Sequence, residues 1–167
     1  ARQKYPEAKF LVTDGLQIPF DDNEFDLVHC TSVLVNEPRY RELLTEMYRV
    51  SNRFVLADMR LLKNLGASVD QEESYYKIEF GDDYDGSTVP YVVSDADHVV
   101  NFILTLEPRP KALRGTGYFH AVSHLARTPH KEVCMTIFLI QKGRPDTAGT
   151  VVDLNDLPLD FSIDPSV

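Results

Sequence analysis

The first half of the chain alternates apolar runs and polar turns at the spacing of an α/β fold. Three short apolar runs predict strands, at residues 9–13, 25–31 and 53–58. Between the second and third runs, apolar residues recur at helical spacing from Tyr40 to Val50, and charged residues occupy the opposite face. The runs show little alternation, which favours parallel strands covered by helices on both faces.

The second half begins with a long irregular segment, residues 63–93, that is rich in acidic and aromatic residues. The sequence Ser94-Asp95-Ala96-Asp97 predicts a helix start with Ser94 as its N-cap. Later runs near residues 118–125 and 132–141 predict an antiparallel hairpin. We therefore expect one domain over residues 1–143, in which residues 63–93 are an insertion, and an acidic extended tail over residues 144–167.

Composition narrows the function classes. The chain has 167 residues, 43% of them apolar, and a net charge of −9, which suits one domain with its own core and disfavours nucleic acid or an anionic membrane as a partner. It has no apolar run long enough to cross a bilayer. The two cysteines and five histidines lack metal-site spacing, so we expect no metal and a reduced, cytoplasmic protein.

The segment DGLQIPFDDNEFDLV, residues 14–28, resembles the D-A-x-x-L-P-F-x-D-x-x-F-D-x-V signature of class I S-adenosylmethionine-dependent methyltransferases. The nearest subgroup is the ubiquinone/menaquinone type, which acts on small molecules. EMYRV, residues 46–50, is similar to the E-x-x-R-V helix end of that family. The resemblance implies a Rossmann-like sheet, mostly parallel with a C-terminal antiparallel hairpin, and S-adenosylmethionine as cofactor. It also implies that the cofactor is bound by Asp14, Gly15, Leu16, Cys30 and Thr31.

Elementary chemistry supports some of these assignments. A carboxylate just past a strand end, such as that of Asp14, can accept a hydrogen bond from an adenine amine, and Gly15 lets the backbone approach the ring. Thr31 ends the next strand at the same crevice. Taken alone, Asp14-Gly15 is better explained as a turn signal and Thr31 as a strand cap; the whole pattern reverses this and favours cofactor binding.

Catalysis by methyl transfer requires alignment and at most one proton acceptor. Asp58, at the end of the third predicted strand, is a candidate general base, and the alternative is a carboxylate that caps a loop. His29, in the middle of a strand, is interpreted as a buried core histidine. Asp26 and Glu46 are interpreted as structural.

The glycine-rich turn of the family is absent from the sequence. No G-x-G-x-G occurs, and Gly115-Thr116-Gly117, beside the predicted hairpin, is a poor substitute. In the family's sheet, the two strands around that turn lie between the strands predicted at residues 10–13 and 26–30. The chain is therefore expected to be a C-terminal portion with N-terminal strands missing, which binds the cofactor weakly or not at all. The alternative is a complete chain whose open edge is covered, for instance in a homodimer.

Two further questions stay open at this point. The aromatic residues in the irregular segment favour either a lid over a small organic substrate or a satellite cluster that packs a loop; they are Tyr75, Tyr76, Phe80, Tyr84 and Tyr91. The alternative to an enzyme is a non-catalytic methyltransferase-like interaction module. A dinucleotide-dependent oxidoreductase is disfavoured because its glycine fingerprint is absent. The sequence does not indicate which substrate, or which atom of it, is methylated.

Overall fold

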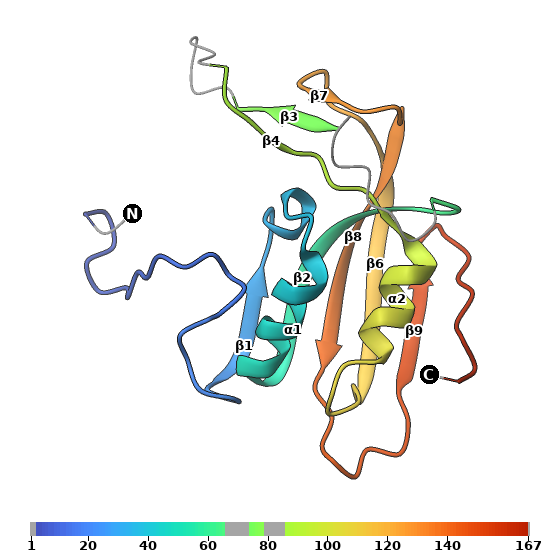
Figure 1. Cartoon of the computed structure of the whole chain (residues 1–167). Helices are drawn as coiled ribbons and strands as arrows, with labels where there is room; N and C mark the ends of the chain where they lie inside the picture. The colour runs from blue at the N-terminus through green and yellow to red at the C-terminus, as the bar shows by residue number, and fades with distance from the viewer. Residues whose placement is uncertain (1–2, 66–73, 79–85, 167) are drawn as a thin grey trace.

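The computed structural model describes residues 3–65, 74–78 and 86–166 and shows a mixed sheet with two helices (Figure 1). The main path of the sheet has the order β1-β2-β8-β6-β9. These strands span Phe25–Cys30, Ser51–Leu62, Glu132–Gln141, Ala112–Ala121 and Val151–Asp156. The short strand β5 (Ser94–Asp95) pairs with β2 off this path.

The pairing combines both strand directions. β1 runs parallel to β2, whereas β8 runs antiparallel to both β2 and β6. β9 adds a parallel neighbour to β6 at the other edge. The α/β class and the antiparallel hairpin predicted from the sequence are thus confirmed.

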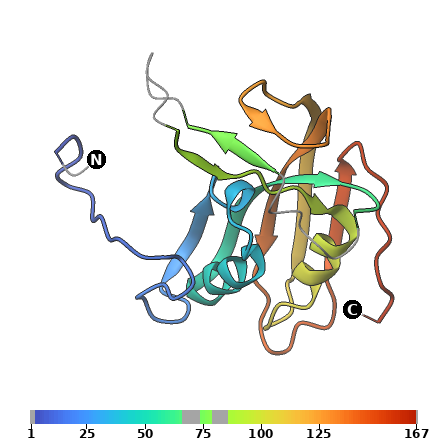
Figure 2. The same cartoon turned by 45° about the horizontal axis from the view of Figure 1, so that its top comes forward.

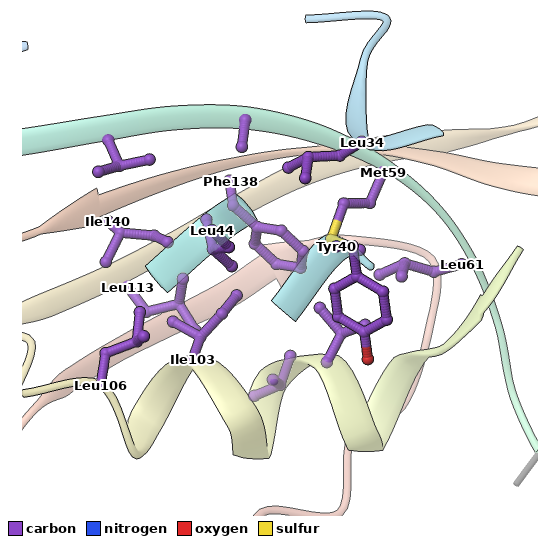
Figure 3. Packing of buried hydrophobic residues seen from close by; sticks show 14 of the residues in the cluster. Leu34, Tyr40, Leu44, Met59, Leu61, Ile103, Leu106, Leu113, Phe138 and Ile140 are labelled. Carbon is purple, nitrogen blue, oxygen red and sulfur yellow. The ribbon is translucent and has the colours of Figure 1, made fainter. Parts of the chain in front are cut away.

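The two helices are α1 (Tyr40–Val50) and α2 (Ala96–Leu104), and a 3-10 turn, η1 (Leu34–Asn36), precedes α1. Their apolar faces meet the odd-numbered residues of β2 and alternate residues of β8 in one core. Figure 3 shows Phe138 of β8 beside Leu44 of α1, with Ile103 of α2 in the same cluster. All three side chains are almost fully buried, so this contact joins both helices to the sheet.

Both helices lie on the same face of the sheet, which corrects the prediction that helices cover both faces. The opposite face, called the outer face below, carries even-numbered residues of β2 and their cross-strand partners. Exposed apolar side chains on it include Leu27, Ile137 and Tyr118, at 52%, 43% and 62% exposure. His29 shares this face and is exposed, so its interpretation as a buried histidine was wrong. Continuous apolar runs did not reveal that one face lacks a cover.

The strand predicted at residues 9–13 is also wrong. This segment has no strand pairing, and Leu11 and Val12 are 49% and 96% exposed. Figure 2 shows it leading away from the body of the protein. An apolar run forms a strand only when a neighbouring strand accepts its hydrogen bonds, and no described strand lies beside it.

The start of α2 differs from prediction by one residue. Asp95, not Ser94, is the N-cap, and its carboxylate accepts from the backbone N–H groups of Asp97 and His98. The Ser94 hydroxyl is buried without a hydrogen-bond partner among the described residues. Either side chain can cap a helix; here Asp95 also accepts from the Leu65 N–H at 2.9 Å, a long-range contact that local sequence does not encode.

A second, small sheet stands above the main one, in the order β4-β3-β7 (Figures 1 and 2). Its strands span Thr88–Pro90, Tyr75–Lys77 and Ala126–Arg127. Part of the expected insertion, residues 63–93, therefore pairs with the connection between β6 and β8. Phe80 and Tyr84, two of the aromatic residues noted above, lie outside the described residues.

The acidic tail contributes to the main domain. Leu157, just after β9, is 7% exposed and belongs to the main core. Farther along, Ser162 donates its backbone N–H to the Asp97 carboxylate, and its carbonyl accepts from Asn101, both on α2. The tail therefore packs along α2 after completing the sheet.

Tyr48 gives a pH-dependent prediction. Its buried hydroxyl donates to the Pro108 carbonyl at 2.7 Å, and burial raises its pKa to about 12. A raised pKa in the folded state means that stability is fully present below pH 10 and is lost as pH rises from about 10 to 12. Between pH 10 and 12, the free energy of unfolding of Tyr48→Phe should therefore fall by about 2 kcal/mol less than that of the wild type.

Urea unfolding of the wild type and Tyr48→Phe between pH 8 and 12 measures the difference. Tyr118→Phe, at a position 62% exposed, is the control and should keep the wild-type pH dependence. Parallel curves for the wild type and Tyr48→Phe would contradict the assignment.

Candidate functional site

A tight loop places the first group of predicted cofactor-binding residues. Asp14 accepts the Leu16 backbone N–H on Oδ1 at 3.0 Å, and the Thr13 hydroxyl accepts the Gly15 N–H. Gly15 has φ of +78°, a conformation that favours glycine. A Cβ at Gly15 would also lie 2.9 Å from the Leu43 side chain. Gly15 is thus required both by its backbone angle and by its contact with α1.

The Ile18-Pro19-Phe20 corner is held by the end of α1. Arg49 donates to the carbonyl oxygens of Ile18 and Phe20, both at 2.9 Å. Glu46 accepts the Ile18 N–H at 2.9 Å and is bonded to the Arg49 guanidinium. Hydrogen bonding to Arg49 lowers the pKa of Glu46. Glu46 is structural in these contacts.

The sequence analysis did not foresee the role of Arg49. Its signal was present, because an acidic and a basic residue at i and i+3 near a helix end share one face. The sequence did not show that this helix face contacts the backbone carbonyls of Ile18 and Phe20, about 30 positions earlier in the chain. The E-x-x-R spacing of this chain therefore positions the Ile-Pro-Phe corner.

The second group lies where β1 ends. Ser32 follows Thr31 with φ of +61°, and its backbone N–H donates to both Asp58 oxygens at 2.8 and 3.1 Å. A left-handed serine costs free energy unless its surroundings hold it. Asp58 of β2 stabilises this conformation through the two hydrogen bonds, as the loop-capping alternative of the sequence analysis expected. Its role as a general base stays a prediction.

Cys30, the last residue of β1, is half-buried. Burial raises the pKa of its thiol, with a smaller contribution from the Asp58 charge. The thiol is therefore protonated at neutral pH and a poor nucleophile. It therefore serves as an apolar wall at the end of β1 rather than as a reactive group.

Asp14 lies close enough to the start of α1 to interact electrostatically with Glu37. Hydrogen bonding from Arg39 lowers the pKa of Glu37, and the negative charge of Asp14 opposes this shift. Among the described residues, no hydrogen bond joins the loop of Asp14 to Thr31. Within the described ranges, no cluster of three or more His, Cys, Asp or Glu side chains is placed to hold a metal ion, and no described helix is long and apolar enough to span a membrane.

Comparison with known proteins identifies the N-terminal segment. Residues 1–53 match the family model described as a methyltransferase domain. No curated protein sequence matches the chain.

Two solved structures resemble the fold. One is a SAM-dependent methyltransferase of Methanosarcina mazei, with 15% identity and a TM-score of 0.47; the alignment covers 81% of this chain and 67% of that one. The other is a protein of Pyrococcus horikoshii OT3, with 18% identity and a TM-score of 0.49, covering 85% and 65% of the two chains. This chain thus spans about two thirds of the length of each. The match of residues 1–53 to a methyltransferase-domain model confirms the resemblance stated from the motifs.

Proposed function

We propose that this chain is the substrate-side part of an S-adenosylmethionine-dependent methyltransferase that acts on a small organic molecule. The observation that carries the proposal is the match of residues 1–53 to a methyltransferase domain, combined with the loop of Asp14 and Gly15 at the crevice end of β1. The net charge of −9 argues against nucleic acid as the substrate.

The residues present fit one side of the cofactor. Asp14 uses Oδ1 for its own loop, and Oδ2 remains to accept from the exocyclic amine of adenine. Gly15, without a Cβ, leaves room for the ring plane. Thr31 and the Cys30 wall would meet the sugar or methionine portion. S-adenosylmethionine supplies an electrophilic methyl group when bound.

This chain's own residues would orient the substrate and accept its proton. Asp58 is the candidate acceptor, because it stands beyond the end of β1 on the outer face. Its two hydrogen bonds from the Ser32 N–H hold the carboxylate in place.

Titration of S-adenosylhomocysteine by calorimetry tests the function. We would compare the 167-residue chain with the product of its complete reading frame, including any upstream sequence. Binding only by the longer product would support a two-part site completed upstream. Binding by neither would contradict the proposal and favour the non-catalytic interaction module.

Asp14→Ala should weaken S-adenosylhomocysteine binding by about 1–3 kcal/mol in whichever form binds, because the adenine amine loses its acceptor. The readout is the dissociation constant from the same titration.

Asp14→Asn separates the ligand contact from the loop. It retains an oxygen for the Leu16 N–H and should keep the loop folded. Asp21→Ala, an exposed carboxylate in the same region, is the control and should bind as the wild type does. Equal affinity of Asp14→Ala and the wild type would remove Asp14 from the site.

A further inference from the structure

Arg60 is a charged residue of β2 on the outer face, beyond the end of β1. Its guanidinium carbon lies 3.8 Å from the centre of the Tyr91 ring. One of its nitrogens, Nη1, donates to the Val35 carbonyl of η1. The same carbonyl accepts the Val92 N–H at 2.9 Å. The guanidinium is thus fixed between η1 and the segment that leads into α2.

The positive charge of Arg60 has no anionic partner among residues 3–65, 74–78 and 86–166. No carboxylate there forms an ion pair with it, and Asp58, two positions earlier, is bonded to the Ser32 N–H. Burial lowers the pKa of Arg60, and the nearby Tyr91 and Asp58 oppose this shift without forming an ion pair with it. A guanidinium carries five N–H donors, and Val35 takes only one nitrogen.

The unused nitrogens are accessible to a ligand. None of them is among the buried side-chain nitrogens without a partner. A half-buried cation with spare donors is stabilised by an anion that accepts from it. The geometry therefore provides a fixed, unpaired guanidinium with room for an acceptor.

The surroundings of Arg60 restrict the chemistry of that anion. Tyr76 of β3 is close enough to affect the pKa of Tyr91, and both tyrosines belong to an apolar cluster with Val93, Val133 and Met135. Asp58 contributes negative charge to the same face. A monoanion on an apolar body fits this environment better than a phosphate dianion, which the Asp58 charge would repel more strongly.

We propose that Arg60 binds the carboxylate of a small organic acid, with the Tyr91 ring supporting the guanidinium. The assignment rests on the proposed function, whose substrate it narrows to a carboxylic acid. Arg60 lies in the part of β2 that extends past the carboxyl end of β1, on the same face as Asp58.

Nuclear magnetic resonance of arginine side chains tests the assignment in the 167-residue chain. Benzoate is the probe, benzamide its neutral counterpart, and inorganic phosphate the competing anion. Arg60→Lys identifies the Arg60 Nε–Hε signal by its loss. We expect benzoate to shift that signal at concentrations where benzamide and phosphate do not.

Arg60→Met should weaken benzoate binding about ten- to a hundredfold, the usual loss when a charge-assisted pair is removed. Arg127→Met is the matched control, since Arg127 also lies over a tyrosine ring, 5.9 Å from the centre of Tyr75, but is exposed. It should bind benzoate as the wild type does.

Equal shifts with benzoate and benzamide, or tighter binding of phosphate, would overturn the assignment. If Arg60→Met does not fold, the wild-type spectra still decide, because Arg60 must respond to benzoate more strongly than Arg127. These readouts need no cofactor. Failure of S-adenosylhomocysteine to bind would therefore refute the methyltransferase proposal without altering the result for Arg60.

Discussion

Ending the chain after Gly149 is expected to leave a protein without a stable fold at 25 °C. The deletion removes β9 and exposes the hydrogen-bonding edge of β6. It also removes Leu157, a side chain only 7% exposed within the main core. Truncating one such leucine to alanine costs about 2–5 kcal/mol, which is a large share of the 5–15 kcal/mol that typically stabilises a domain.

Thermal unfolding followed by circular dichroism measures this effect. Leu157→Ala isolates the core contact. Val151→Ala is the control: Val151 belongs to β9 and is 67% exposed, so its replacement should be nearly neutral. A shortened chain with a cooperative transition close to that of the wild type would show that β9 and Leu157 are dispensable.

Gly117→Ala is expected to lower the free energy of unfolding by about 1–3 kcal/mol or more, the usual cost of overpacking. A Cβ at Gly117 would overlap the Met135 carbonyl oxygen of the neighbouring strand β8 and lie 2.8 Å from Leu157. Because the first obstacle is backbone, relief requires β6 and β8 to separate. The pairing of the central hairpin would then weaken.

Gly115→Ala provides a matched comparison for Gly117→Ala. The three atoms nearest to its Cβ would all belong to side chains, those of Leu157, Leu154 and Phe138, at 2.7 to 3.1 Å. Side chains can shift more easily than a paired strand, so Gly115→Ala should destabilise less in urea unfolding. The reverse order of the two variants would refute the backbone argument.

These glycines also show what the only G-x-G of the chain does. The sequence analysis compared it with a cofactor-binding turn and found it a poor substitute. In the structure, Gly115 and Gly117 make space on β6 for leucines of the tail. Their spacing of two is that of residues on one face of a strand, which explains a G-x-G without any nucleotide.

Elements with strong local signals were predictable. Helical spacing located α1, and the apolar run at residues 132–141 matches β8. Features set by distant partners were not: the run at residues 9–13 lacks a neighbouring strand, and the N-cap of α2 is decided by a contact with Leu65. Local propensity cannot report either condition.

The candidate site also combines residues predicted from local sequence with contacts that only the fold creates. Asp14 and Gly15 were identified from a fixed motif, and their loop has the expected tight turn. The anchoring of the neighbouring corner by Arg49 and the unpaired guanidinium of Arg60 depend on residues brought together by the fold. The sequence analysis ended the third predicted strand at residue 58 and did not single out Arg60.

The uncovered outer face has a consequence for the behaviour of the protein in solution. Its exposed Leu27, Ile137 and Tyr118 attract other apolar surfaces, while the net charge of −9 makes copies of the chain repel one another. Salt shortens the range of that repulsion to about 8 Å at physiological ionic strength but leaves the apolar attraction in place. Colloidal stability is therefore greatest in dilute buffer, and ionic strength sets the balance between dispersed chains and self-association.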